Sequence, residues 1–91
     1  MKMKETEAIF TIVFRNLALA NWTKLLPEAQ VQMLEEVYGL MLCETLAFDS
    51  KRQLGWRLDV LQNYVTELER ERIKKIMGLL EKPAVAELNY A

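Results

Sequence analysis

The longest helical pattern in this chain lies in residues 51–77, which read KRQLGWRLDVLQNYVTELERERIKKIM. Apolar residues recur in it every three or four positions, which is the spacing of one face of an α-helix. Ser50 and Gln53 match a capping box at its start, Gly78 suits its end, and Pro83 is a firm stop. We therefore predict one helix over residues 51–78. Its apolar stripe consists of Leu54, Leu58, Leu61, Val65, Leu68, Ile76 and Leu79.

The length of this predicted helix constrains the shape of the molecule. A straight helix rises about 1.5 Å per residue, so residues 51–77 span roughly 40 Å. A compact globule of 91 residues has a diameter of only roughly 30 Å. The pattern therefore predicts either a kink, for which Gly55 is the candidate, or an elongated molecule.

Two further helices are predicted before it. Residues 4–21 carry apolar side chains at helical spacing, and residues 27–48 begin with Pro27, which is favoured in the first turn of a helix. No strand-like alternation of useful length occurs. We expect an all-α fold, an elongated three-helix bundle with a long C-terminal helix. It forms a single domain over residues 1–82, with a short tail over residues 83–91.

Composition argues against several classes of function. The chain has 91 residues, a net charge of −1, one cysteine and no histidine. Near-neutral charge gives no general attraction to nucleic acid or to an anionic membrane. No apolar stretch approaches the roughly 20 residues of a membrane span. A lone cysteine forms no intrachain disulfide, which suits a reducing compartment. We expect a soluble cytoplasmic protein.

Catalytic and metal-binding chemistry has few candidates. Cys43 is the only candidate nucleophile, but we expect it deep in a helix, without a histidine to lower its pKa. Glu35 and Glu36 are adjacent, so on a helix they point about 100° apart and do not converge. No glycine-containing calcium loop or phosphate loop is present. We predict no enzymatic activity, no metal and no cofactor.

Apolar residues exceed what three helices bury easily. Residues 27–48 are apolar around most of the predicted helix, and Trp56 begins a second apolar seam away from the main stripe of residues 51–78. An antiparallel pairing of these two helices places Pro27 opposite Arg72, so the residues after Arg72 extend beyond it. We predict a homodimer through the second and third helices. The predicted contact residues are Trp56, Val60, Tyr64, Ile73, Ile76 and Met77.

Two alternatives to the homodimer stay open. The same residues could be covered within an ordinary three-helix core, or they could form a surface for a different protein. Residues 28–49 contain only acidic charges, a stripe that an inhibitor could offer to a basic partner. We expect a small non-catalytic regulatory, adaptor or inhibitor protein that acts by protein–protein contact.

Glu44 and Arg72 are charges placed within the predicted apolar faces. Either could pair across a dimer and fix its register. Within one chain, Arg72 could instead meet Glu28, and Glu44 could meet Arg52 or Arg57. The register hypothesis fails if both side chains point freely into solvent.

A second class of function rests on basic residues. Lys51, Arg52 and Arg57 cluster at the start of the third predicted helix, with Trp56 among them, which is compatible with contact to DNA. Residues 26–30, which read LPEAQ, resemble the start of some small bacterial antitoxin-type helical proteins. This resemblance covers only that stretch and implies no site residue. A DNA-binding regulator or antitoxin-like protein is therefore the alternative function.

Overall fold

Five α-helices and one short 3₁₀ helix make up this computed structural model, which describes the backbone of residues 3–90 and the side chains of residues 5–80. No strand occurs within residues 3–90, so the predicted all-α class is confirmed. The elements are α1 (Met3–Asn16), α2 (Leu19–Trp22), α3 (Pro27–Leu42), α4 (Phe48–Leu61), the 3₁₀ helix η1 (Gln62–Tyr64) and α5 (Glu67–Tyr90).

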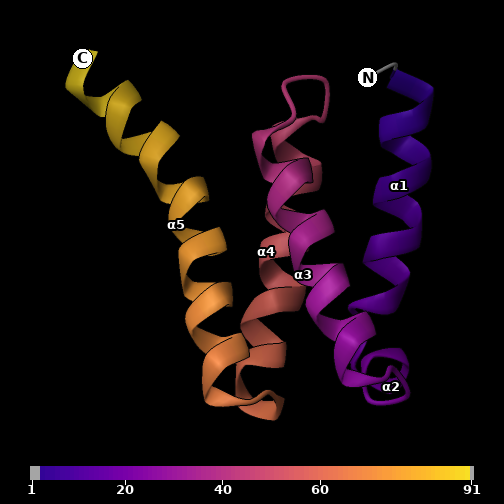
Figure 1. Ribbon diagram of the computed structural model, residues 1–91. Helices are drawn as coiled ribbons and strands as arrows, with labels where there is room; N and C mark the ends of the chain where they lie inside the picture. The colour runs from indigo at the N-terminus through magenta and orange to yellow at the C-terminus, as the bar shows by residue number, and fades with distance from the viewer. Residues whose placement is uncertain (1–2, 91) are drawn as a thin grey trace.

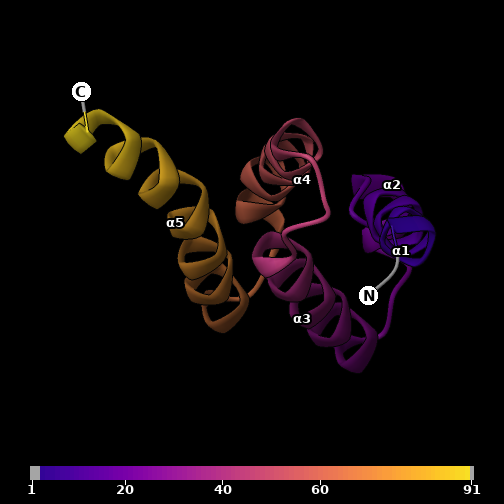
Figure 2. The same ribbon diagram turned by 90° about the horizontal axis from the view of Figure 1, so that it is seen from above.

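The four longer helices alternate in direction, with α1 and α4 running down and α3 and α5 running up in Figure 1. α3 packs against both α1 and α5, and α5 also packs along α4. Seen from above, α4 lies between α5 and the α1–α2 pair (Figure 2). One apolar core fills the space between the helices. It consists of Val13, Leu17, Trp22, Leu34, Val37, Leu40, Met41, Leu46, Leu54, Leu58, Leu61, Ile73 and Ile76.

The first predicted helix, residues 4–21, is shorter than expected, because α1 ends at Asn16. Two asparagine amides bond to backbone carbonyls near this end: Asn16 Nδ2 donates to Ile12 O at 3.0 Å, and Asn21 Nδ2 donates to Arg15 O at 2.9 Å. Such side-chain bonds compete with the continuing helical ladder. The chain therefore turns after Asn16, and the short helix α2 carries Trp22 into the core.

The second predicted helix, residues 27–48, ends early at Leu42, and residues 43–47 form a loop. Cys43 has extended backbone angles, φ −79° and ψ 118°. Its sulfur and the Thr45 hydroxyl both contact the hydroxyl of Thr6 on α1. The predicted capping box of Ser50 and Gln53 is wrong, because α4 begins at Phe48 with Ala47 as its N-cap and no side-chain cap.

The third predicted helix, residues 51–78, is two helices. Val65 adopts extended angles, φ −120° and ψ 166°, after η1. Thr66 then caps α5: its backbone N–H and hydroxyl contact Glu69 Oε1 at 3.0 and 3.1 Å, and its hydroxyl oxygen accepts the Glu69 N–H at 3.2 Å. This reciprocal pattern is a capping box. The chain therefore reverses at this point rather than at a kink in Gly55.

The reversal explains why the predicted elongated shape is wrong. α5 folds back along α4 and α3, and the radius of gyration is 13.3 Å, close to the value of about 12 Å expected for a compact chain of this length. Pro83 does not stop the helix, since the α5 backbone continues to Tyr90; a proline inside a helix can kink it without ending it. The C-terminal end of α5 leans away from the bundle in Figure 1. Of the predicted tail over residues 83–91, Ala91 lies outside the described residues.

Candidate interaction surface on α4

Helix α4 has two faces with different environments. Its inner residues Leu54, Leu58 and Leu61 are fully buried in the core. Its outer side and the following 3₁₀ helix expose large side chains: Trp56 is 62% exposed, Val60 53% and Tyr64 59%. We call this outer side the α4 surface, formed by Phe48, Arg52, Trp56, Asp59, Val60 and Tyr64.

A groove of about 490 Å³ separates the α4 surface from α1. Its apolar walls come from the first helix and from α4, and Arg57 crosses it with its guanidinium carbon 4.1 Å from the centre of the Phe14 ring. We call it the α1–α4 groove. Its lining residues are Phe14, Leu17, Gln53, Trp56, Arg57 and Val60.

A second groove, of about 540 Å³, lies on the other side of Trp56. We call it the α4–α5 groove. Gly55 forms its floor, and here α5 approaches α4 so closely that a Cβ atom on Gly55 would lie 2.6 Å from Leu80 Cδ1. The other lining residues are Phe48, Arg52, Trp56, Asp59, Met77 and Leu80. Trp56 borders both grooves and therefore forms a ridge between them.

Opposite charges lie one turn before and one turn after Trp56 along α4, both at the edge of the α4–α5 groove. The guanidinium carbon of Arg52 is 5.5 Å from the centre of the Trp56 ring, a cation–π contact. Asp59 Oδ1 accepts a hydrogen bond from Gln62 Nε2 at 3.0 Å. Neither charge forms an ion pair with another described side chain. The α4 surface thus presents one cation and one anion within reach of a second molecule.

The predicted contact residues separate into two groups. Trp56, Val60 and Tyr64 lie on the α4 surface, and Met77 is half-buried in the α4–α5 groove. Ile73 and Ile76 are fully buried in the core and so do not lie on any surface. The prediction that they extend beyond the second helix is wrong, because the reversal at Thr66 places α5 directly against α3 and α4.

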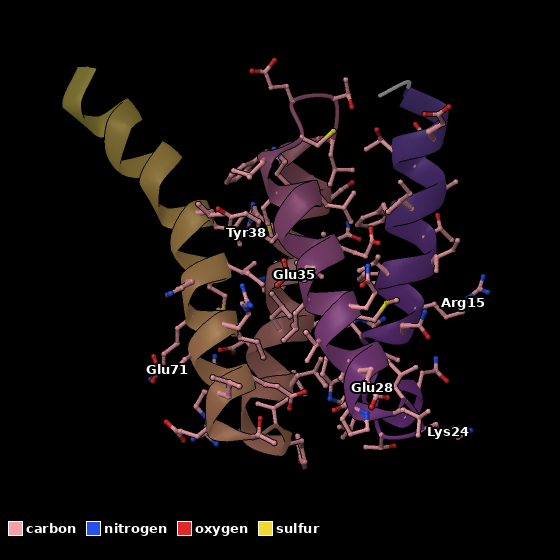
Figure 3. All side chains as sticks on the ribbon, viewed as in Figure 1. Arg15, Lys24, Glu28, Glu35, Tyr38 and Glu71 are labelled. Carbon is pink, nitrogen blue, oxygen red and sulfur yellow. The ribbon has the colours of Figure 1, made fainter. Side chains whose placement is uncertain are left out.

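The two predicted register charges also lie apart. Arg72 donates to Glu35 Oε1 at 3.0 Å, in place of the Glu28 partner considered above, and Glu35 lies on the part of α3 that faces α5 (Figure 3). Glu44 lies exposed in the loop after α3 and forms no ion pair among the described side chains. Arg72 therefore joins α3 to α5 within one chain.

The three basic residues of the DNA alternative do not form one face. Consecutive residues of a helix are separated by about 100°, so Lys51, Arg52 and Arg57 point in three directions around α4. Arg52 lies beside Trp56, Arg57 lies over Phe14, and Lys51 is half-buried. A DNA-binding surface usually gathers its cations on one side.

Cys43 lies at the end of α3 rather than deep inside a helix. Its sulfur is 3.0 Å from Thr45 Oγ1 and 3.7 Å from Thr6 Oγ1. The Thr45 hydroxyl, then the Thr45 backbone N–H and the Thr6 hydroxyl, lower the pKa of the Cys43 thiol from 9.0 to about 7. The thiolate is stabilised, but a chain without histidine offers no imidazole base beside it. The described residues contain no cluster of ligands suited to a metal ion.

Sequence reasoning missed the walls of the grooves. Phe14 and Leu17 belong to the apolar face of the first predicted helix, and nothing in their spacing indicates that they border Trp56. The only available signal for the α4–α5 groove is Gly55, because a glycine within a helical pattern often marks a close approach of another segment.

Comparison of this chain with models of protein families, with curated proteins and with solved structures finds no match. Among the described residues, no helix combines the length and the apolar character that crossing a membrane requires.

Proposed function

We propose that this chain is a small non-catalytic regulatory, adaptor or inhibitor protein that acts by binding another protein chain through the α4 surface. The observation that carries this proposal is the exposure of Trp56 on a ridge between two apolar grooves. Tryptophan, tyrosine and arginine most often dominate the binding energy of protein interfaces. Trp56, Tyr64 and Arg52 supply one of each.

The chemistry of the surface supports contact rather than reaction. Its charged groups are Arg52, which lies against an aromatic ring, and Asp59, which accepts a bond from an amide. Cys43 lies in the loop after α3 and lines neither groove. The DNA alternative has weaker support, because Lys51, Arg52 and Arg57 diverge around α4.

Photocrosslinking in the cells that naturally make the protein tests this proposal. A photoreactive benzophenone amino acid replaces Val60, which is exposed on the α4 surface. Illumination then crosslinks this probe covalently to any protein in contact with it. A matched chain carries the same probe at Leu26, which is 70% exposed in the turn before α3. We expect a discrete protein adduct from position 60 and none from position 26.

The masses of the adducts then identify the kind of partner. An adduct of twice the mass of the chain indicates a second copy, and any other discrete mass indicates a different protein. Absence of an adduct at position 60, or an equal yield from position 26, would overturn the proposed function.

A further inference from the structure

We propose that the partner of the α4 surface is a second copy of this chain, bound so that the two α4 helices cross antiparallel about a two-fold axis at Trp56. This inference rests on the proposed function and identifies the partner of the same surface. In a two-fold interface, each patch must be complementary to itself, because residue i contacts j while j contacts i.

The charges of the α4 surface satisfy this condition. Arg52 lies about one turn before Trp56 and Asp59 about one turn after it. Two antiparallel helices centred on Trp56 therefore bring Arg52 next to Asp59 of the partner subunit, and the symmetry axis repeats the pair. Both charges lack an ion-pair partner among the described side chains of their own chain. A strongly acidic or basic partner would leave one of these two charges opposed by its own sign.

The spacing of the residues before and after Trp56 on α4 also fits a second copy. Arg52, Trp56 and Val60 follow one another at every fourth position. Ridges with this spacing interdigitate when two helices cross at about −50°, the commonest packing of helices in globular proteins. Arg52, Trp56 and Asp59 all border the α4–α5 groove, so this groove is the one that receives the ridge of the other copy. Figure 2 shows the side of α4 that faces away from α3 uncovered by the other described helices.

The exposed area indicates a weak dimer. Phe48, Trp56 and Tyr64 are about half exposed, and aromatic side chains bury about 150–250 Å² each, so together they offer roughly 300 Å² per copy. Stable interfaces bury about 800 Å² per partner. We therefore expect a weak, reversible monomer–dimer equilibrium rather than a permanent dimer.

A charge-swap experiment on the purified chain tests the pairing. Sedimentation velocity is measured across the micromolar range for the natural chain, for Arg52→Glu and for Asp59→Arg. Each variant places like charges together twice across the axis, so we expect each to weaken self-association by at least about tenfold. An equimolar mixture of the two variants pairs opposite charges at both contacts, and we expect it to associate as the natural chain does.

Matched controls separate this pairing from a general effect of charge. Lys24→Glu and Glu71→Arg make the same changes of charge at side chains that point outward from opposite sides of the molecule (Figure 3). We expect both to associate like the natural chain. Arg52 and Asp59 are both exposed, so we expect every variant to retain its helices. Circular dichroism of each variant checks this.

Two results would overturn the inference: a natural chain that stays monomeric across the concentration range, or a mixture that associates no better than the single variants. The crosslinking experiment then separates the two proposals. An adduct of position 60 with a different protein leaves the proposed function standing without the dimer. Absence of any adduct contradicts both.

Discussion

At the end of α3, the Cys43 sulfur lies 3.0 Å from the Thr45 hydroxyl and 3.7 Å from that of Thr6. Hydroxyl groups that donate to sulfur favour the thiolate over the thiol, and the pKa of Cys43 falls to about 7. A thiolate is the reactive form of cysteine toward alkylating reagents. Cys43 is therefore a more reactive thiol than the neighbouring apolar sequence indicates.

We expect the rate at which iodoacetamide alkylates Cys43 to rise with pH around a midpoint of about 7. Thr45→Val removes the largest stabilising contribution, so its midpoint moves toward the ordinary value of 9.0. Thr11→Val is the control, because that hydroxyl bonds to Glu7 O on α1. A natural chain with a midpoint near 9.0 would contradict the hydroxyl contact.

The same pKa shift determines how the stability of the folded state depends on pH. Because folding lowers the pKa of Cys43, the thiolate contributes to the stability of the folded state at pH values above the ordinary 9.0. This contribution is lost as the pH falls through about 7. Thr45→Val should flatten this part of the dependence of the free energy of unfolding on pH.

Among the elements, the junction between η1 and α5 determines how the chain folds back on itself. Thr66 and Glu69 satisfy each other's backbone N–H groups there. Arg70 Nε also donates to Gln62 O at 3.0 Å, which ties the first turn of α5 to η1. The two helices on either side of the junction thus meet in a fixed hairpin.

We expect Thr66→Ala to lower the free energy of unfolding by about 1 kcal/mol, because the cap of α5 is lost. For a chain of this size, such a loss lowers Tm by roughly 4–8 °C. Thr66→Ser keeps the capping hydroxyl and should retain most of the stability. Thermal unfolding followed by circular dichroism measures both, and an unchanged Tm for Thr66→Ala would contradict the role of the cap.

Two glycines within helices make a matched pair for a second prediction. Gly39 has open space where a Cβ atom would be placed, so Gly39→Ala should raise the free energy of unfolding by about 0.5–1 kcal/mol through helix propensity. Gly55→Ala gains the same propensity but meets Leu80 Cδ1 at 2.6 Å. We expect Gly55→Ala to raise the free energy of unfolding, measured with urea, by clearly less than Gly39→Ala does. Equal increases for the two variants would contradict the close approach of α5 to Gly55.

Amphipathic spacing predicts the positions of the helices well and their ends poorly. Leu61, Val65 and Leu68 keep helical spacing across the junction, so the apolar stripe passes through the break without a signal. Ser50–Gln53 and Thr66–Glu69 carry equally good capping patterns in the sequence, and only the second is used. The choice depends on which segments pack together, which is tertiary information that local spacing does not contain.

For the whole molecule, the sequence correctly predicts the all-α class. The predicted elongated shape is wrong, because the chain reverses at Thr66. Helical spacing placed Trp56, Val60 and Tyr64 off the core stripe, and the structure exposes all three. Their contact with another chain stays a prediction. Ile73 and Ile76 belong to the core because α5 packs directly against α3 and α4 rather than extending beyond them.

The two tryptophans give a direct measurement of this packing. Trp22 is 1% exposed and Trp56 is 62% exposed. We expect Trp56→Phe to shift the fluorescence maximum to shorter wavelength and to reduce quenching by acrylamide, because only the buried indole remains. Trp22→Phe should have the opposite effect in both measurements. Equal quenching of the two variants, with helicity intact, would contradict the placement of Trp56 outside the core.

The division of α4 into a buried and an exposed face has a consequence for how such a protein changes over generations. Leu54, Leu58 and Leu61 maintain the core, and none of them lines either groove beside Trp56. Under the proposed function, replacements at Trp56 or Val60 would therefore alter what α4 binds while the fold persists. A few substitutions at outward positions of α4 would then be enough to change the proposed binding specificity, and the same positions can be varied in protein engineering without disturbing the core.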